Sequence, residues 1–336
     1  MNQADVLNLA REDSLTPMLD QVIEGRRAWT RDSVGPEDWT VPLGKTALKE
    51  IEGMLEILRR DPLPILMLTT DQFDLTACAE AMGRVKDILT EGLGVAVLDR
   101  LPLDEMTVEE AKSVYWILGQ FLATEVAQKW DGAMFYDVTN TGAKYGYGVR
   151  GSWTDVELFF HTDNAFGIAP PNFVSLLCFH PAQKGGVSRF CSLYTIHNEM
   201  LKHHPKLLRR LYEPCNYDRQ AEHAPGDPRI SRSPTFRFDG KRLKTRLAAS
   251  LVYKAHELMG EELDQEAQEA FAVMGELLLD PSLWMEFTIE RGQMQYLNNW
   301  EFAHFRSSFE DAEDPALKRH LIRLWYREEG RCSYNG

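Results

Sequence analysis

The sequence predicts a mainly β fold with flanking helices. From about residue 153 onward, short apolar runs of strand type alternate with turns that are rich in glycine and proline. In roughly the first 90 residues, apolar side chains instead recur at helical spacing. No fixed-period repeat, low-complexity tract or proline-rich linker divides the 336 residues, which favours a single domain with a helical amino-terminal elaboration.

The amino-terminal third is predicted to contain helices and one buried strand. Helical spacing is found in two sets of apolar residues: Leu48, Ile51, Leu55 and Leu58, then Ala77, Ala81, Val85 and Ile88. The run 92–98 reads as a turn followed by a buried strand. Thr107 and Glu110 then form a capping-box pattern that opens a helix reaching about Phe121. Glycines at 142, 146, 148 and 151 indicate a long loop or hairpin.

The rest of the chain is predicted to be rich in strands. Runs 158–161 and 173–179 have strand character and are separated by a turn at 168–172. Residues 193–201 read as the start of a helix, and a helical block is expected at 246–279. Strands return at 284–290, 293–297 and 319–327.

Composition limits the classes of partner and compartment. The chain has 37 Lys and Arg against 51 Asp and Glu, a formal charge of −14, so neither nucleic acid nor an anionic membrane is expected as the main partner. The five cysteines are far apart and read as free thiols in a reducing compartment. No secretion signal or bilayer-length apolar run is recognisable, so we expect a cytoplasmic protein.

His161 and Asp163 form the first pattern with chemical content. They end a predicted strand two residues apart, so their side chains point to the same side while Thr162 points away. One imidazole, one carboxylate and a remote second histidine would make the triad that holds Fe(II) and leaves positions open for substrates. A second H-x-E copy, His197 and Glu199, lies in a predicted helix, where residues two apart do not share a face.

The neighbouring motifs resemble the Fe(II)/2-oxoglutarate oxygenase family that includes taurine dioxygenase and 2,4-dichlorophenoxyacetate dioxygenase. His161-Thr162-Asp163 is followed by Pro170-Pro171 and then by Gly185-Gly186-Val187-Ser188. The stretch 297–306 is similar to the one that carries the distal iron ligand of the family. The stretch 319–325 is similar to its arginine-bearing strand.

The resemblance implies a site for iron and a co-substrate. It assigns His161, Asp163 and His304 as ligands of Fe(II), with 2-oxoglutarate and O2 as co-substrates. Ser188 takes the place of the family hydroxyl that helps to bind 2-oxoglutarate. Arg323 is our choice for its far carboxylate, because a guanidinium can bind it bidentately, and Arg319 is the alternative.

The resemblance also implies a fold and a reaction. The core would be a double-stranded β-helix of the jelly-roll, cupin-like type. Residues 1–90 would form a helical elaboration and 91–336 the oxygenase domain with a helical insert near 246–279; the helical parts would cover a sheet edge or form a homo-oligomer contact. Hydroxylation, desaturation or cyclisation at an unactivated C–H bond is expected, with release of succinate and CO2. The rival class is a non-redox metal-dependent hydrolase or a cupin-like small-molecule-binding protein.

The substrate is expected to be a small organic molecule of amino-acid, betaine, sulfonate, phosphonate or natural-product type. Its candidate contacts are Tyr147, Arg150, Asn164, Phe166 and Asn299. Arg150 could pair an anionic group, and the tyrosines near it could face a quaternary ammonium. The alternative is that the glycines simply build a hairpin and that Arg150 belongs to a surface ion pair.

Overall fold

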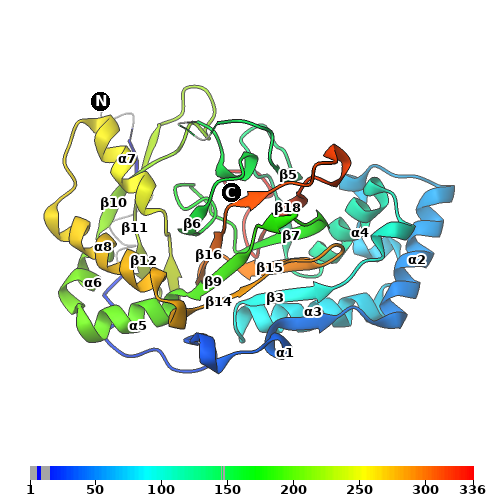
Figure 1. The fold of residues 1–336 in the computed structure, drawn as a ribbon, viewed down its shortest axis with the longest axis horizontal. Helices are drawn as coiled ribbons and strands as arrows, with labels where there is room; N and C mark the ends of the chain where they lie inside the picture. Colours follow the sequence, from blue (N-terminus) through cyan, green and yellow to red (C-terminus); the bar gives the residue numbers. More distant parts are fainter. Residues whose placement is uncertain (1–5, 9–15, 145, 147) are drawn as a thin grey trace.

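The computed structural model describes residues 6–8, 16–144, 146 and 148–336. Two β-sheets form its centre (Figure 1). The larger sheet contains β2 (Thr40–Pro42), β3 (Val95–Asp99), β4 (Thr124–Val126), β5 (Tyr136–Thr139), β7 (Phe173–His180), β15 (Met294–Asn298) and β18 (His320–Arg327). The smaller contains β6 (Leu158–His161), β9 (Ser188–Ser192), β14 (Trp284–Phe287) and β16 (Phe302–Arg306).

The strand order brings distant parts of the chain together. The seven-stranded sheet runs β2-β3-β15-β7-β18-β4, with β5 also paired to β18, and the four-stranded sheet runs β14-β9-β16-β6. Apolar side chains of both sheets pack against one another in one core cluster. Val95, Val97 and Leu297 come from the larger sheet, and Phe190, Met285 and Phe302 from the smaller. Burial of these side chains holds the sheets together.

Three helices cover the outer face of the larger sheet. They are α2 (Gly44–Arg60), α3 (Thr76–Thr90) and α4 (Val108–Gln120) (Figure 1). Buried Ile51, Val85 and Tyr115 share a core with the sheet residues Leu177 and Tyr296. The predicted capping box opens α4: Thr107 N donates to Glu110 Oε2 at 2.8 Å, and Glu110 N donates to Thr107 Oγ1 at 3.2 Å.

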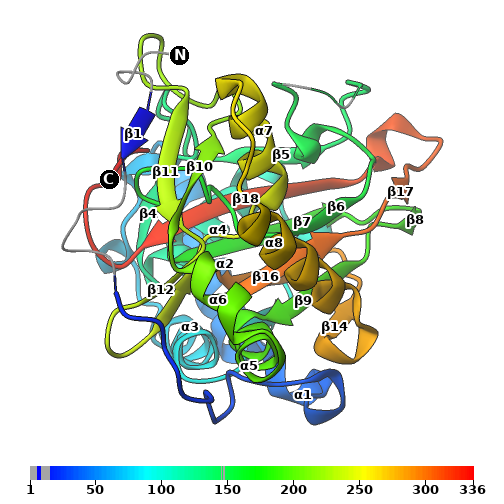
Figure 2. The same cartoon turned by 90° about the vertical axis from the view of Figure 1, so that its left-hand side faces the viewer.

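A second helical group packs on the smaller sheet (Figure 2). It consists of α5 (Leu193–His203), α6 (Pro205–Leu211), α7 (Ala249–Met259) and α8 (Gln265–Leu279). Phe160 and Phe305 of the sheet share a core with Phe271 and Met274 of α8. The remaining elements are α1 (Pro36–Trp39), β1 (Val6–Asn8), β8 (Lys184–Gly185), β10 (Pro214–Asp218), β11 (Ile230–Pro234), β12 (Phe236–Phe238), β13 (Leu243–Thr245) and β17 (Phe309–Glu310), together with short 3-10 turns.

Most predicted elements have counterparts at or near the expected residues. The runs 158–161 and 173–179 are β6 and β7, and the helical block is α7 followed by α8. The strand predicted for 284–290 ends at Phe287. Residues 40–42 form an edge strand beside β3, so the first 90 residues contribute to the sheet as well as to its helical cover.

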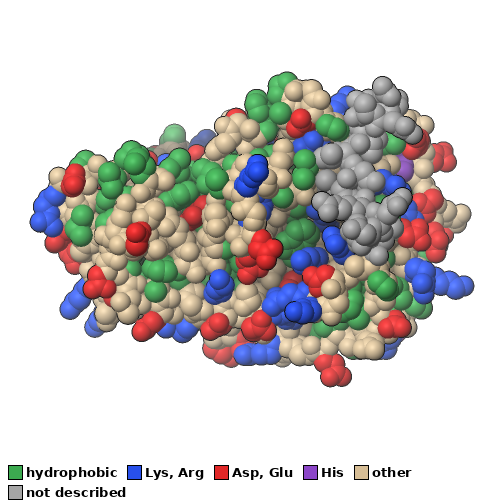
Figure 3. Space-filling model, turned by 180° about the vertical axis from the view of Figure 1, so that it is seen from behind, with side chains coloured by type: hydrophobic (Ala, Val, Ile, Leu, Met, Phe, Trp, Pro, Cys, Tyr) green, Lys and Arg blue, Asp and Glu red, His purple; other side chains and the backbone are tan. Residues whose placement is uncertain are grey.

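The five cysteines are free, and four of them are buried. Within the described ranges, no helix combines the length and apolar character needed to cross a bilayer. On the face seen in Figure 3, acidic and basic side chains lie among one another, with no single extended basic area.

Candidate metal centre and active site

His161, Asp163 and His304 lie together at the end of the smaller sheet. His161 ends β6, and His304 is its direct partner on the antiparallel strand β16. The Nε2 atoms of His161 and His304 lie 3.7 and 3.6 Å from Asp163 Oδ1. One potential ligand atom from each residue lies within 4.8 Å of the others, and no other such cluster occurs among the described residues. The two nitrogens and one oxygen therefore converge as the sequence predicted.

Thr162 lies just beyond the end of β6, and its side chain is engaged with Leu247 and not with the cluster. Its Oγ1 accepts from Leu247 N at 3.0 Å, and its own N–H donates to Leu247 O at 2.9 Å. The turn that carries Asp163 is thereby anchored to the segment that leads into α7.

The electrostatics of the cluster favour metal ligation. Burial, together with the neighbouring His304, lowers the pKa of His161 to about 4. His161 is therefore neutral near pH 7. Its Nδ1 lies 2.7 Å from Phe159 O, so the tautomer with Nδ1–H donating to this carbonyl leaves the Nε2 lone pair free for a metal.

Asp163 is held as a carboxylate by its surroundings. Burial alone would raise its pKa, but the Arg323 guanidinium, together with the contact with His304, outweighs burial and holds the pKa well below its usual range. Asp163 Oδ2 accepts from Arg323 Nη1 at 2.8 Å and from Trp325 Nε1 at 2.9 Å. These donors occupy Oδ2, so Oδ1 is the oxygen that faces both histidines.

Asn299 fixes the backbone of Asp163. Its side-chain Oδ1 accepts from Asp163 N at 2.7 Å, and its Nδ2 donates to Asp163 O at 2.9 Å and to Pro171 O at 3.2 Å. The residue is only 1% exposed. Asn299 was predicted as a substrate contact; its side-chain amide is instead engaged with the backbone of a predicted metal ligand.

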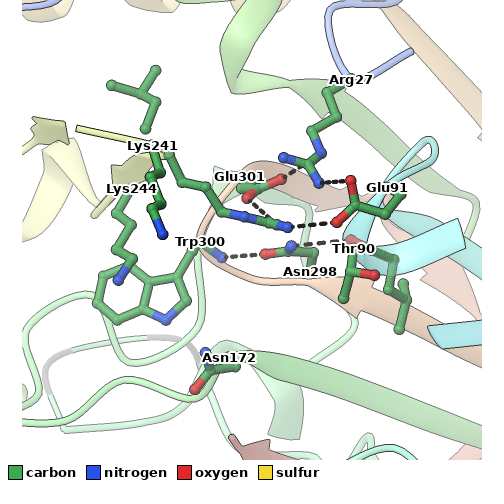
Figure 4. A network of polar contacts seen from close by, with 12 residues as sticks. Arg27, Thr90, Glu91, Asn172, Lys241, Lys244, Asn298, Trp300 and Glu301 are labelled. Atoms are coloured by element: carbon green, nitrogen blue, oxygen red, sulfur yellow. Dashed lines mark hydrogen bonds and ion pairs between the residues drawn. The ribbon is translucent and has the colours of Figure 1, made fainter. Parts of the chain in front are cut away.

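Charged side chains secure the turn that carries Asn299 (Figure 4). The buried carboxylate of Glu301 lies 3.0 Å from Arg242 Nη1 and 3.5 Å from Arg27 Nε. Both arginines also reach Glu91, at 2.8 and 3.3 Å. The network thus ties the turn between β15 and β16 to the amino-terminal segment, to the end of α3 and to the β12–β13 hairpin.

The residues predicted for 2-oxoglutarate lie on or beside strands of both sheets. Ser188 starts β9, is buried, and pairs with Arg306 on β16. Arg319 precedes β18 and is 3% exposed; its guanidinium carbon lies 5.0 Å from the centroid of the Phe309 ring, and its Nη1 has no partner among the described residues. Burial lowers the pKa of Arg319 to about 10. Arg323 is engaged differently, because its Nε donates to Gln128 at 2.8 Å while its Nη1 pairs with Asp163.

A cavity of about 370 Å³ opens beside the cluster. His161, Asp163 and Arg323 line it on one side, and apolar residues of α7 and α8, including Leu251 and Met274, line another. A separate surface pocket of about 380 Å³, between Trp39 and Phe287, includes none of the predicted ligands.

Arg150 and Glu222 form a buried ion pair in the cavity wall. Arg150 Nη2 is bonded to Glu222 Oε2, and the two side chains are only 11% and 15% exposed. The Arg150 and Arg323 guanidinium carbons lie 4.8 and 4.7 Å from the centroid of the Tyr136 ring. Burial raises the pKa of Glu222, and Arg150 opposes this effect. The expected alternative of a surface pair is wrong for Arg150.

The other predicted substrate residues have mixed positions. Asn164 and Phe166 line the cavity, and Asn164 adopts a left-handed backbone conformation with φ of 54°. Tyr147 lies outside the described residues. The second H-x-E copy does not bring two ligands together, because His197 Nε2 bonds with Tyr212 OH at 2.8 Å whereas Glu199 pairs with His203.

Sequence reasoning missed several residues of the site. Trp325 could have been found, because it lies two residues beyond Arg323 and so on the same face of the strand. Glu222 and Gln128 lie outside any motif, and nothing in the local sequence indicates their partners.

Two histidines and one ionised carboxylate converge beside a cavity lined by two arginines, which is the arrangement of the two-His-one-carboxylate iron enzymes. Residues 61–325 match the family model described as "Taurine catabolism dioxygenase TauD, TfdA family". The chain belongs to this family, and it is an Fe(II)- and 2-oxoglutarate-dependent dioxygenase. The predicted resemblance is confirmed, and the non-redox alternative has no support.

Individual relatives agree with this assignment. FR-33289 synthase of Streptomyces rubellomurinus (strain ATCC 31215) is 27% identical over an alignment of 328 positions that covers 94% of each chain. The solved asparagine oxygenase in complex with Fe(II), 2S,3S-3-hydroxyasparagine and succinate has a TM-score of 0.66 at 18% identity, over 86% of this chain and 94% of that one. OrfP, a non-heme iron oxygenase solved with Fe and alpha-ketoglutaric acid, has a TM-score of 0.61 at 14% identity with the same coverage. These two structures share the sheet-rich fold with flanking helices.

Proposed function

We propose that this dioxygenase hydroxylates an unactivated C–H bond of a small substrate that carries both an acidic and a cationic group. The observation that carries the proposal is the cavity that joins His161 and Asp163 to the Arg150–Glu222 pair. Its volume of about 370 Å³ suits a molecule of amino-acid size. Desaturation and cyclisation use the same site and remain the alternative outcomes at the same C–H bond.

His161 Nε2, His304 Nε2 and Asp163 Oδ1 are the atoms that we assign to Fe(II). The fit rests on their convergence and on the neutral state of His161, which leaves a lone pair for the metal. Arg323 and Trp325 keep the second carboxylate oxygen occupied, which supports ligation through Oδ1 alone. A retained carboxylate ligand also favours C–H oxidation over halogenation, in which a small residue makes room for chloride.

Arg319 is the residue that we assign to the far carboxylate of 2-oxoglutarate, with Ser188 as a second contact. The sequence favoured Arg323, but the contacts support Arg319 because its buried guanidinium has an unpartnered Nη1 and forms no ion pair with a described carboxylate. A buried cation without a counter-ion is unfavourable unless an anion binds it. Arg323 already has Asp163 as its counter-ion.

When bound, Fe(II), 2-oxoglutarate and O2 supply the oxidising power, and succinate and CO2 are released. The chain supplies orientation and exclusion of water. Asn299 holds the backbone of Asp163, and Arg323 with Trp325 sets the rotation of its carboxylate. Apolar residues of α7 and α8, among them Leu251, Phe271 and Met274, line the cavity and limit the access of water.

The Arg150–Glu222 pair supports a substrate with two opposite charges. When a ligand enters the cavity, Arg150 can pair with its acidic group and Glu222 with its cationic group. Each buried charge then keeps a partner of opposite sign. An amino acid, an aminophosphonate, an aminosulfonate or a betaine has these groups. The asparagine oxygenase neighbour, whose structure contains hydroxyasparagine, acts on such a molecule.

Four broader assignments accompany the site. We infer that the two packed sheets form the double-stranded β-helix of the jelly-roll type. We propose the division into a helical elaboration over 1–90 and an oxygenase domain over 91–336. The free cysteines support a reducing, cytoplasmic setting. We also retain a homo-oligomer as a proposal, without assigning its interface.

The first test is spectroscopic. Under anaerobic conditions, Fe(II) and 2-oxoglutarate together should produce a weak visible absorption band near ~500 nm, as metal–keto-acid chelation requires. Arg319→Lys should strongly raise the concentration of 2-oxoglutarate that is needed to form this band. Arg323→Lys serves as the comparison, and a larger effect of Arg323→Lys would return the role to that residue.

The second test concerns the substrate. Succinate release is measured with amino acids, aminophosphonates, aminosulfonates and betaines, each beside its N-acylated or uncharged analogue. We expect the zwitterionic forms to stimulate release, and Glu222→Gln to raise the KM for them selectively. Stimulation by the N-acylated forms alone would contradict a role of Glu222 in binding a cationic group.

A further inference from the structure

Arg306 connects the end of β16 to the loop before β6. Its side chain is buried, and Nη2 donates to three carbonyl oxygens of this loop: Val156 at 2.5 Å, Thr154 at 2.9 Å and Gly151 at 3.4 Å. One nitrogen of the guanidinium thus contacts three peptide carbonyls of one loop, and Nε and Nη1 are left for another partner.

The inner side of the same loop forms part of the substrate cavity. Gly151 and Ser152 line this cavity together with Arg150 and His161. On the other side, Phe309 N donates to Asp155 O at 3.1 Å. The path of residues 151–156 therefore determines the shape of the cavity next to the predicted iron site, and Arg306 helps to determine this path.

The other donors of Arg306 are buried and take no part in holding the loop. Its Nε and Nη1 have no partner among the described residues, and neither does Nη1 of Arg319. Both guanidinium carbons lie close to one ring, 4.9 and 5.0 Å from the centroid of Phe309. Within the described ranges no carboxylate forms an ion pair with either arginine, although Asp155 and Asp311 are near enough to favour their charged forms.

These contacts imply a physical link between two sites. Two buried, neighbouring cations repel each other and favour the binding of an anion between or beside them. An anion that binds here restricts the guanidinium groups, and a restricted Arg306 in turn holds the loop carbonyls more firmly. By reciprocity, a well-ordered loop must then favour binding of the anion by the same factor.

We propose that Arg306 is a positioning residue that couples binding of an anion beside Arg319 to the order of loop 151–156, a wall of the substrate cavity. The inference rests on the proposed function, in which Arg319 binds the far carboxylate of 2-oxoglutarate. In addition to anchoring the co-substrate, the charge of this carboxylate would order loop 151–156 and so fix the shape of the substrate cavity.

Hydrogen exchange of the full chain tests the coupling without turnover. Zn(II) replaces Fe(II), so that the loaded protein oxidises nothing, and exchange is followed in peptides that contain Trp153 and Thr154. The amides of these residues close local turns on Arg150 O and Gly151 O. We expect 2-oxoglutarate to slow their exchange by at least about fivefold. 2-Oxovalerate has the same chelating end and chain length but no far carboxylate, and should slow it much less. Equal protection by both ligands, or no protection by either, would overturn the proposal.

Two variants separate the roles of charge and geometry. Arg306→Lys keeps the positive charge but has a single nitrogen, which cannot contact the loop and an anion on different sides at once. 2-Oxoglutarate should therefore still bind while the additional protection of the loop disappears. Arg189→Lys is the matched control, because Arg189 lies on the neighbouring strand, stacks on Trp284 and Phe305, and already pairs with Glu286 at 3.0 Å. It should behave as the native protein. Native protection in Arg306→Lys would refute the coupling role.

The outcomes also distinguish this inference from the proposed function. If native Fe(II) protein gives no visible band with 2-oxoglutarate, the proposed co-substrate site is wrong, and the coupling is wrong with it. If the band forms but the loop exchanges at an unchanged rate, only the coupling is wrong. The native comparison of 2-oxoglutarate with 2-oxovalerate separates these cases even if Arg306→Lys does not fold.

Discussion

Asn299→Ala should lower the affinity for Fe(II), although Asn299 is not itself a predicted ligand. The substitution removes three hydrogen bonds, to Asp163 N, Asp163 O and Pro171 O, at a residue that is 1% exposed. At about 1 kcal/mol for each bond, the free energy of unfolding should fall by about 3 kcal/mol. Because the peptide groups on both sides of Asp163 lose their anchor, the affinity for Fe(II) should fall about 10–100-fold, as for other residues that orient metal ligands.

The neighbouring Asn298→Ala is the matched control. Asn298 is also buried, and its side chain makes two hydrogen bonds, with Leu89 O and Trp300 N, neither of which involves a predicted ligand. It should lose about 2 kcal/mol of stability in urea unfolding and keep its iron affinity. Anaerobic Fe(II) titration of both variants separates the two effects. If Asn299→Ala binds iron as tightly as Asn298→Ala does, the positioning role is refuted.

Three further predictions concern the ligand set, a buried acid and a tight turn. Asp163→Ala should abolish iron binding and substrate-coupled succinate formation; activity without an added ligand would show that the triad is assigned wrongly. Burial raises the pKa of Glu125 to about 8 from an ordinary 4.5, so ionisation should lower native stability as the pH rises from about 4.5 to about 8, by at most about 5 kcal/mol. Urea unfolding of Glu125→Gln should therefore show a gain at about pH 9 and little change at about pH 4, and an equal effect at both would refute the burial argument. Gly94 has φ of 74°, and an added Cβ would lie 1.8 Å from the Phe302 ring, so Gly94→Ala should cost about 2–4 kcal/mol by the same assay; an unchanged midpoint would contradict the packing between the sheets.

Local signals explain why much of the fold could be predicted. The capping pattern of Thr107 and Glu110 and the apolar spacing in the first 90 residues depend on contacts within one or two helical turns. Strand β6 was predicted for the same reason, since alternation is a property of a single strand. The position of Thr40–Pro42 as an edge strand was not predicted, because it depends on the distant strand β3.

The sequence by itself determined the enzyme family and which residue types could bind the metal. Strand alternation predicted that His161 and Asp163 would lie together, and the order of motifs predicted His304 as their partner, although Asp163 lies in the turn after β6. Only the tertiary structure decided how the charged side chains are paired. Arg323 meets Asp163 across 160 positions of the chain, and Arg150 meets Glu222 across 72. A buried guanidinium pairs with an anion that tertiary packing brings close to it. Because this packing involves distant strands and loops, a local sequence pattern does not predict the partner. The unpartnered donors of Arg319 and Arg306 can be recognised only from the three-dimensional contacts of the side chains around them.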